Sequence, residues 1–347
     1  MAAAGPVTVL PVVGIPEVAA GDDLGELVAA GLDRSGLQLL PGDIVVVSSK
    51  VASKALGLIA SSEDRAAVVA GQTVRVVAER VSDGQVTRIV ESAAGPVMAA
   101  AGVDASNVGG RGGVLLLPHD PDAVCRGLRE SLTGRTGVAP VGVILSDTAG
   151  RPWRVGQTDF ALGAAGVGVV DDLRGGLDAD GRGLMVTARA VADEIAAAAD
   201  LVKGKVSRVP VALVRGLAAQ VSVEDGPGAR SLVRTGAGDW FALGAHEAVR
   251  AALGVAPGTP RAVEVGLRPA AGDDHDAAVR RAVTAARLPL GDLAADVEVT
   301  GTGPLVVTGP DAVAVGMVAA RLCVALAGEG LPTLLSVRAG SVEVVWS

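Results

Sequence analysis

Aromatic side chains are almost absent from this sequence, which has no Tyr, two Phe and three Trp among 347 residues. Ala, Val, Leu and Gly supply most of the apolar content, and half of all residues are hydrophobic. Such small side chains pack well in strands buried on both faces and in tight helix–sheet contacts. A GC-rich genome would produce the same bias, so we draw no function from it. The length suggests about two domains.

Cysteine and histidine are also scarce. Cys125 and Cys323 lie far apart in apolar helical patterns, and we expect small buried side chains rather than a disulfide or a metal site. His119, His246 and His275 are too few for a His-rich zinc site. Any metal must therefore be held mainly by oxygen, which favours Mg²⁺ or Mn²⁺. We assign His119 no catalytic role, because it precedes a typical helix start.

The net charge of −8 argues against binding of nucleic acid, which needs a basic surface. An anionic small molecule is still compatible with this charge, because it needs only local Lys, Arg, backbone N–H groups or metal ions. Residues 1–13 lack the basic start and apolar core of a signal peptide. The longest apolar helical stretch, 312–326, is interrupted by Arg321 and is shorter than the roughly 20 residues of a membrane helix. We expect a soluble, cytoplasmic protein.

Three common nucleotide and hydrolase motifs are missing. Gly204-Lys205 is followed by Val206, so there is no phosphate-binding Gly-x-x-x-x-Gly-Lys-Ser/Thr loop. No Gly-x-Gly-x-x-Gly follows a predicted strand, and no Gly-x-Ser-x-Gly elbow accompanies a credible Ser/His/Asp set. A P-loop fold, a standard dinucleotide fold and a serine hydrolase are therefore unsupported.

The hydrophobic pattern predicts an α+β or mixed α/β fold in two domains. The first, 1–248, would hold the site, and the second, 249–347, is a small α/β domain of unknown role. Strands are expected at 7–13, 44–47, 114–117, 141–145 and 209–214, and helices at 22–32, 64–78, 121–132 and 188–202. The tail is expected to add strands at 262–267, 297–307, 334–337 and 342–346 and helices at 277–288 and 311–327, after a linker at 256–260.

Polar side chains follow three of these apolar runs directly. The segments are Ser48-Ser49-Lys50, 104–107 and Ser146-Asp147-Thr148. In α/β folds, ligands bind where the carboxyl ends of strands meet loops. Asp104 and Asp147, with the Thr148 hydroxyl, suit a hard cation that also binds phosphate oxygens. The alternative is that one carboxylate caps a helix and the other forms a turn.

Two other sets are candidates for ligand contacts. Ser49 and Lys54 can cradle a phosphate with a hydroxyl and a point charge, although a solvated loop explains them equally well. Arg151, Trp153 and Arg154 form a short loop in which arginine forks suit carboxylate or phosphate and Trp suits an aromatic ring. A structural corner pinned by Trp153 is the alternative. The acidic face of helix 188–202 is interpreted as a solvated or interface face.

Four segments together resemble the coenzyme F420:L-glutamate ligase family, of the actinobacterial type. They are GIPE at 14–17 with GDDL at 21–24, SSKVASK at 48–54, AGVDASN at 101–107 and SDTAGRPWR at 146–154. Asp193-Glu194 with 197–202 and Val214-Arg215-Gly216 continue the match, which covers about residues 7–247. The order, spacing and number of these segments make the resemblance specific.

The resemblance implies a gamma-glutamyl ligase-like fold with mixed sheets and the following chemistry. GTP phosphorylates the terminal carboxylate of coenzyme F420-0, and the amine of L-glutamate attacks the acyl phosphate to form an amide, once or repeatedly. Two Mg²⁺ or Mn²⁺ ions bridge the phosphates, and K⁺ is a further candidate ion. Phosphoryl transfer depends mainly on positioning and charge neutralisation, which fits the residues at the strand ends. Family members form intertwined dimers, so a homodimer is implied.

Carried over by motif, the resemblance assigns roles to individual residues. The metal ligands would be Asp104, Asp147 and Thr148. The nucleotide would contact Leu10, Pro11, Val12, Val13, Ser48, Ser49, Lys54 and Asn107. Arg151, Trp153 and Arg154 would face the anionic deazaflavin or the phosphates, and the catalytic set would be Asp104, Asp147, Arg151 and Arg154.

The sequence departs from the family pattern in two places. Some relatives have Gln or Glu as a metal ligand near Gly204-Lys205, and a lysine cannot ligate, which leaves the second-metal ligands open. Some actinobacterial relatives carry a long flavin-binding, nitroreductase-like C-terminal domain, and residues 249–347 are too few for it. We therefore expect no flavin, and interpret the tail as a truncated remnant or a separate interaction module.

Two alternatives to this function remain open from the sequence. One is a ligase of the same fold that uses ATP or GTP on another carboxylate. The other is a catalytically inactive relative with a structural or regulatory role. The intact motifs favour an active enzyme.

Overall fold

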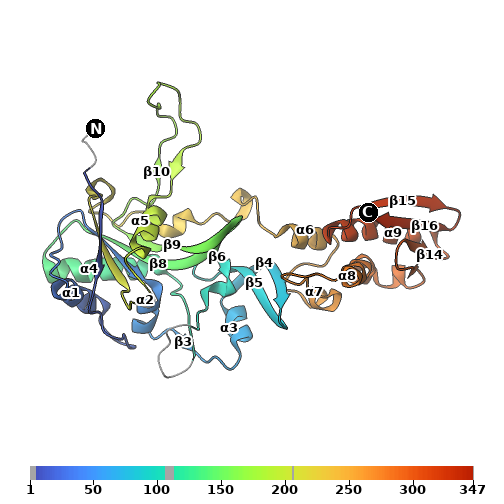
Figure 1. The fold of residues 1–347 in the computed structure, drawn as a ribbon, viewed down its shortest axis with the longest axis horizontal. Helices are drawn as coiled ribbons and strands as arrows, with labels where there is room; N and C mark the ends of the chain where they lie inside the picture. The colour runs from blue at the N-terminus through green and yellow to red at the C-terminus, as the bar shows by residue number, and fades with distance from the viewer. Residues whose placement is uncertain (1–4, 106–112, 205–206, 347) are drawn as a thin grey trace. The chain divides into compact units, whose positions relative to one another are not determined.

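The chain divides into two compact units in the computed structural model, which describes residues 5–105, 113–204 and 207–346 (Figure 1). The first unit consists of Met1–Thr73 and Ser92–Arg234, and the second of Val74–Glu91 and Thr235–Ser347. The expected boundary after residue 248 falls inside helix α6 (Ala245–Ala252). The second unit also takes residues 74–91, which the sequence analysis placed in the first.

A five-stranded mixed sheet is the centre of the first unit. Its strand order is β1 (Thr8–Val12), β12 (Val211–Arg215), β2 (Ile44–Ser48), β8 (Gly142–Arg151) and β9 (Arg154–Ala165). Strands β2 and β8 are parallel, and every other pair in this sheet is antiparallel. The predicted α+β class with mixed sheets is confirmed.

Helices cover both faces of this sheet, which explains why its strands are continuous apolar runs. Along β2, Val45 and Val47 belong to the core that contains helices α1 (Leu24–Arg34), α2 (Ser49–Ala55) and α4 (Pro121–Thr136). Ile44 and Val46 belong to the opposite core with the Ala-rich helix α5 (Val191–Asp200). Successive side chains of a strand point to opposite faces, so one strand serves two cores.

Shorter elements complete the first unit. They are β3 (Ile59–Ala60), α3 (Arg65–Gly71), β6 (Val97–Ala99), β7 (Val114–Leu115), β10 (Asp171–Asp172) and β11 (Ala188–Arg189), with 3₁₀ turns at Ala100–Gly102, Ala218–Gln220 and Ala229–Leu232. Strands β10 and β11 pair antiparallel at the base of an arm that projects from this unit in Figure 1. The arm exposes Leu177, Met185 and Val186.

The second unit begins with β4 (Thr73–Ser82) and β5 (Gln85–Ser92), joined at Asp83 and Gly84, which both have positive φ. Asp-Gly at such a position is a strong hairpin signal. Its helices are α6, α7 (Pro260–Val265), α8 (His275–Arg287) and α9 (Ala312–Gly328), with 3₁₀ turns at Gly236–Gly238 and Leu288–Ala294. Its antiparallel sheet has the strand order β13 (Glu298–Thr300), β14 (Leu305–Thr308), β16 (Ser341–Trp346) and β15 (Thr333–Arg338).

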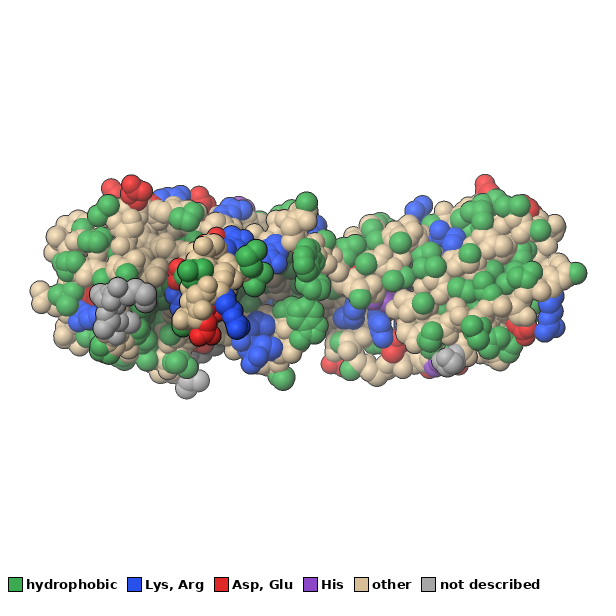
Figure 2. Space-filling model, turned by 90° about the horizontal axis from the view of Figure 1, so that it is seen from above, with side chains coloured by type: hydrophobic (Ala, Val, Ile, Leu, Met, Phe, Trp, Pro, Cys, Tyr) green, Lys and Arg blue, Asp and Glu red, His purple; other side chains and the backbone are tan. Residues whose placement is uncertain are grey.

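The core of the second unit is aliphatic and packs α9 against this sheet and α8 against α9. A buried ionic cluster lies beside it, in which the Glu329 carboxylate accepts hydrogen bonds from Arg250 at 2.9 Å and Arg281 at 2.7 Å. The unit also exposes apolar side chains (Figure 2), among them Leu334, Leu335 and Val337 of β15.

Several predicted elements differ from the structure. The helix predicted at 64–78 ends at Gly71, and β4 follows, because Thr73, Val74, Val76 and Val77 favour a strand. The strand predicted at 262–267 is helix α7, which starts from a Thr259 cap with Pro260 at its first position. The predicted strand 297–307 is the hairpin of β13 and β14. Strand β9 was not predicted at all.

Two further expectations concern cysteines and membranes. Cys125 is buried and Cys323 half-buried, and both are free thiols in apolar surroundings, as predicted. Among the described residues, no helix combines the length and the apolar content needed to cross a membrane.

Candidate active site

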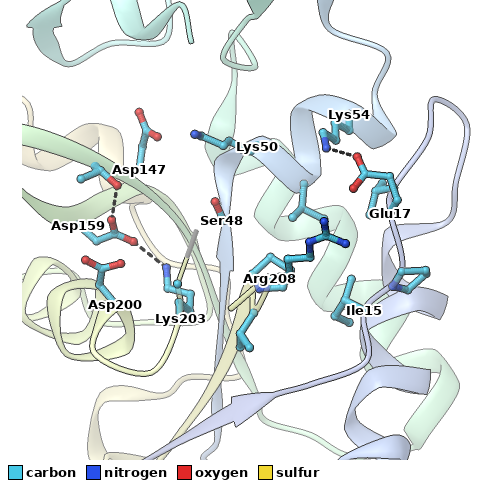
Figure 3. Close-up of a pocket in the computed structure, with 17 residues that line it drawn as sticks. Ile15, Glu17, Ser48, Lys50, Lys54, Asp147, Asp159, Asp200, Lys203 and Arg208 are labelled. Atoms are coloured by element: carbon cyan, nitrogen blue, oxygen red, sulfur yellow. Dashed lines mark hydrogen bonds and ion pairs between the residues drawn. The ribbon is translucent and has the colours of Figure 1, made fainter. Parts of the chain in front are cut away.

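The carboxyl end of β2 lies beside the middle of β8, because these two strands are parallel and in register up to Ser48 opposite Ser146. Strand β8 continues to Arg151 and does not end at residue 145 as predicted. A cavity of about 640 Å³ opens beside these two strands (Figure 3). It is lined by Ile15, Pro16, Glu17, Val18, Ser48, Lys50, Val51, Lys54, Asp147, Thr148, Asp159, Asp200, Lys203, Gly204, Arg208, Val209 and Pro210. The candidates Ser48, Lys54, Asp147 and Thr148 therefore share one cavity.

Helix α2 brings its polar side chains to this cavity. Lys50 and Lys54 are four residues apart, so they lie on the same helix face, and both line the cavity. Ser49 is fully buried and its hydroxyl donates a 2.8 Å hydrogen bond to Asp147 Oδ1. The Lys54 ammonium is paired with the exposed Glu17 carboxylate. Helix α2 thus contributes two cations to the cavity that Asp147 of β8 also lines.

Asp147 is an acidic side chain of the cavity whose pKa is raised well above its ordinary value of 3.8. Burial raises the pKa of Asp147 to about 6, and the charges of Asp159 and Asp104 add to this rise. The hydrogen bonds from Ser49 and from the backbone of Thr148 oppose it. A carboxylate crowded by other negative charges gains from a bound cation.

Asp104 lies on a neighbouring segment that pairs with Leu115, through backbone hydrogen bonds of 2.8 and 3.1 Å. Its carboxylate forms an ion pair with Lys50 Nζ at 2.5 Å. Asp104 does not line the cavity itself, but Lys50 does, and the Asp104 charge acts on the pKa of Asp147. The structure therefore brings the two predicted carboxylates close to one another.

Asp159 and Lys203 were missed by the sequence analysis. Asp159 Oδ2 accepts hydrogen bonds from Ser146 at 2.8 Å and Lys203 Nζ at 2.7 Å, and Oδ1 accepts one from Thr148 at 2.7 Å. Burial raises the pKa of Asp159, but the charge and hydrogen bonds of Lys203, Thr148 and Ser146 outweigh it and lower the pKa overall. The available signal was that Asp159 directly precedes an apolar run, which is the buried half of β9.

Arg208 adds a cation to the cavity wall, just before β12 (Figure 3). Its φ of 55° lies in the left-handed region, which is uncommon for a residue other than Gly. Backbone of this kind costs free energy and is concentrated at functional sites. Arg208 is therefore a further candidate for ligand contact.

Other predicted site residues lie elsewhere. Arg151, Trp153 and Arg154 are at the exposed tip of the β8–β9 hairpin, where Trp153 is 84% exposed. Leu10, Pro11, Val12 and Val13 lie along or just after β1, and Val12 is fully buried in the core. None of these seven residues is among the described residues that line the cavity. Asn107 and Lys205 lie outside the described residues.

The oxygen donors of this site suit a hard cation such as Mg²⁺ or Mn²⁺. Asp147 and Thr148 line the cavity, and Asp104 lies near enough to influence Asp147. Within the described part of the chain, no three acidic, His or Cys side chains form a ready-made metal cluster. The residues therefore fit a cation held partly by protein oxygens and partly by ligand oxygens, as is common for Mg²⁺ with phosphates.

Lysines, an arginine, hydroxyls and carboxylates around one cavity make a site suited to an anionic substrate and its counter-ion, which is the site of an enzyme rather than of a structural protein. Residues 13–216 match the family described as F420-0:Gamma-glutamyl ligase. The match covers more than half of the chain, and the chain belongs to this family of ligases. The predicted family and enzyme class are confirmed.

Individual relatives agree with this assignment. The chain is 37% identical to the protein named coenzyme F420:L-glutamate ligase of Methanothermobacter thermautotrophicus, over 60% of this chain and 89% of that protein. It is also 37% identical to the proteins of the same name from Methanopyrus kandleri and Halobacterium salinarum, over 65% of this chain and 93% and 92% of theirs. The family match ends before Thr235, where the second unit resumes.

Proposed function

We propose that this chain joins L-glutamate to the terminal carboxylate of coenzyme F420-0 through an amide bond, at the expense of GTP. The names of its relatives give the two substrates. The observation that carries the proposal is the cavity, where Lys50, Lys54, Lys203 and Arg208 surround the same space as Asp147 and Asp159 (Figure 3). Four cationic side chains in a cavity that four acidic side chains also line, including Glu17 and Asp200, suit a triphosphate and its cation.

The proposed reaction has two steps. An oxygen of the F420-0 carboxylate attacks the γ-phosphorus of GTP, so that a P–O bond to GDP breaks and an acyl phosphate forms. The glutamate nitrogen then attacks the acyl carbon, loses a proton and displaces phosphate. Neither step needs a covalent bond to the protein, because positioning and charge stabilisation carry such transfers.

Several residues in and beside the cavity have a part in this proposal. Lys54 and Arg208 would bind phosphate oxygens, and Glu17 would give up its ion pair with Lys54 when the nucleotide arrives. Asp147, Thr148 and Asp104 would hold Mg²⁺ or Mn²⁺. When bound, that cation neutralises charge that develops on the phosphate oxygens. Three further expectations stay predictions: that a second divalent cation binds, that K⁺ binds, and that the second unit holds no flavin.

The substrate end of the site is less defined than the nucleotide end. Arg151, Trp153 and Arg154 form an exposed hairpin tip, and a role for them requires F420-0 to reach that tip.

The implied homodimer also remains a proposal. Light scattering of the purified protein tests it, and a monomeric mass contradicts it.

Incubation with F420-0, glutamate, GTP and Mn²⁺, followed by mass spectrometry, tests the proposed function. We expect a product heavier by one glutamyl residue, or by several, with release of GDP and phosphate. Asp147→Ala should lose the product, and the Asp193→Asn variant, altered in the opposite core, should keep it. Absence of a glutamylated product with the wild-type protein, under conditions where a named relative is active, would overturn the proposal.

A further inference from the structure

A buried carboxylate without a part in the proposed chemistry lies directly behind the predicted cation ligands. We propose that Asp159 is a positioning residue that orients the Thr148 hydroxyl. The hydroxyl proton points to Asp159, so that the Thr148 oxygen presents only its lone pairs to a ligand in the cavity and cannot donate a hydrogen bond to it. This inference rests on the proposed function, because the oriented oxygen would serve the cation of that site. It concerns only residues of this chain.

The geometry comes from the pairing of β8 and β9, which places Thr148 opposite Asp159. Thr148 Oγ1 and Asp159 Oδ1 are 2.7 Å apart. A carboxylate can only accept hydrogen bonds, so the single hydroxyl proton of Thr148 lies between these two oxygens. The lone pairs of Oγ1 are then the only groups that this hydroxyl can offer to the cavity, which Thr148 lines.

Lys203 keeps Asp159 in the accepting role. Its Nζ lies 2.7 Å from Asp159 Oδ2, and the two side chains are 4% and 5% exposed. A buried carboxylate without such a partner tends to take up a proton, and a protonated carboxyl could donate to Thr148. The ion pair with Lys203 therefore keeps Asp159 ionised, so that Asp159 accepts the hydrogen bond from Thr148 and does not donate one to it.

Ser146 completes the arrangement. Its hydroxyl donates to Asp159 Oδ2 at 2.8 Å and accepts a hydrogen bond from Lys203 Nζ. Asp159 Oδ2 thus receives two donors and Oδ1 receives one. Most of the accepting capacity of Asp159 is used by its neighbours, and its charge is balanced by Lys203. Asp159 is therefore better placed to act through Thr148 than to bind a cation itself.

Comparable partners behind metal ligands in other proteins fix ligand orientation, and their loss typically weakens metal affinity by about 10- to 100-fold. The same logic makes Thr148 unsuited to donate to a phosphate oxygen. Loss of Asp159 should therefore weaken cation binding to the extent that it acts through Thr148, and should have no further effect once the Thr148 hydroxyl is gone.

A double-mutant cycle with Mn²⁺ alone tests this inference. The first change is Thr148→Val, which removes the hydroxyl at nearly constant shape. The second is the pair Asp159→Asn with Lys203→Met, which removes both buried charges together and so avoids a lone buried ammonium. Mn²⁺ dissociation constants are measured by electron paramagnetic resonance, and thermal unfolding establishes that each variant is folded.

We expect each change to weaken Mn²⁺ binding by about tenfold and the combination also by about tenfold, because coupled residues are not additive. Asp147→Asn serves to show that the Mn²⁺ binds here, and Asp193→Asn, whose carboxylate contacts β9 at Ala161, should leave affinity unchanged. Thr148→Ser, which keeps a hydroxyl, should retain most of the affinity.

Additive losses of about 100-fold in the combined variant, or no loss with Thr148→Val, would overturn the inference. Because no nucleotide or F420-0 is present, these results do not depend on ligase activity. A protein that binds Mn²⁺ with the expected coupling but forms no glutamyl product refutes the proposed function alone. If the wild-type protein binds no Mn²⁺, or if Asp147→Asn leaves its Mn²⁺ binding unchanged, both the inference and the metal dependence are refuted.

Discussion

The Ser49 hydroxyl donates a 2.8 Å hydrogen bond to Asp147 Oδ1, which ties the first turn of α2 to strand β8. This bond lowers the pKa of Asp147 against the rise caused by burial. Removing it in Ser49→Ala should therefore raise that pKa, so that the carboxylate becomes protonated at a higher pH. Since a cation requires the ionised form, the acid limb of the activity profile should move upward.

We expect a shift of about one pH unit, because a hydrogen bond to a charged group contributes roughly 1.5 kcal/mol or more and 1.36 kcal/mol equals one pKa unit. The measurement is the pH dependence of glutamate-dependent phosphate release. Ser53→Ala, a buried serine on the same helix, is the control. An unmoved acid limb in Ser49→Ala would mean that ionisation of Asp147 does not limit the reaction.

Asp147→Asn should stabilise the cation-free protein at alkaline pH. The folded-state pKa of Asp147, about 6, lies above the ordinary value of 3.8. Its contribution to stability is therefore full below the unfolded pKa and is lost as pH rises through 6. Asn cannot ionise, so the variant avoids this loss.

At pH 8 with a chelator, the gain should be on the order of 1–3 kcal/mol, or about 2–4 °C in Tm for each kcal/mol. Near pH 3.5 the two proteins should unfold alike. A lower Tm for the variant at pH 8 would show that the carboxylate is stabilised by contacts stronger than those described.

Lys54→Met should weaken nucleotide binding by about tenfold or more, because a charge-assisted hydrogen bond contributes roughly 1.5–3 kcal/mol. Glu17→Gln should leave binding equal or stronger, since it releases Lys54 from its ion pair. Fluorescent GTP-analogue titration measures both, and Tm monitors folding. Equal weakening by the two changes would indicate that the ion pair shapes the cavity instead of competing with the nucleotide.

Trp153→Ala tests whether the hairpin tip meets F420-0. If it does, KM for F420-0 should rise by about five- to 150-fold, because stacking on an aromatic ring contributes roughly 1–3 kcal/mol, while KM for GTP stays constant. Folding should be unaffected, since Trp153 is 84% exposed. Val155→Ala, also at the tip and fully exposed, is the matched control. Unchanged kinetics would remove the tip from the substrate site.

Glu329→Gln should destabilise the second unit by about 3–5 kcal/mol, because it leaves Arg250 and Arg281 buried without their shared carboxylate. Burial raises the pKa of Glu329, but the two arginines lower it overall, so its contribution is present above the unfolded pKa and lost in acid. Hydrogen exchange should accelerate in α8 and α9 and not in β2 or β8. Glu343→Gln, paired with the exposed Arg338, should change neither.

The sequence was most informative where one strand of a parallel pair ends in polar residues. Strands β2 and β8 begin as continuous apolar runs, so the change to polar residues at Ser48 and Ser146 was visible, and parallel pairing places these two positions side by side. Asp159 was missed because β9 is antiparallel to β8. Asp159 lies in the middle of β9, and the Gly- and Ala-rich run that follows it gives little β signal.

Short segments of mixed propensity produced the other errors. Residues 64–78 contain a capped helical turn followed by branched residues, and only tertiary pairing decides where one ends. The hairpin tip at Arg151–Arg154 was predicted as a short polar loop with a Trp, but residue type alone could not show that its side chains do not line the cavity.

The β4–β5 hairpin belongs to the unit that otherwise consists of residues after Arg234, although it is encoded within the segment that builds the first unit. The polypeptide therefore leaves the first unit and returns to it before it finally continues to the C-terminus. A stop codon after residue 234 would remove most of the second unit and leave residues 74–91 in the shortened chain. Neither unit could finish folding during synthesis until part of the other had been made.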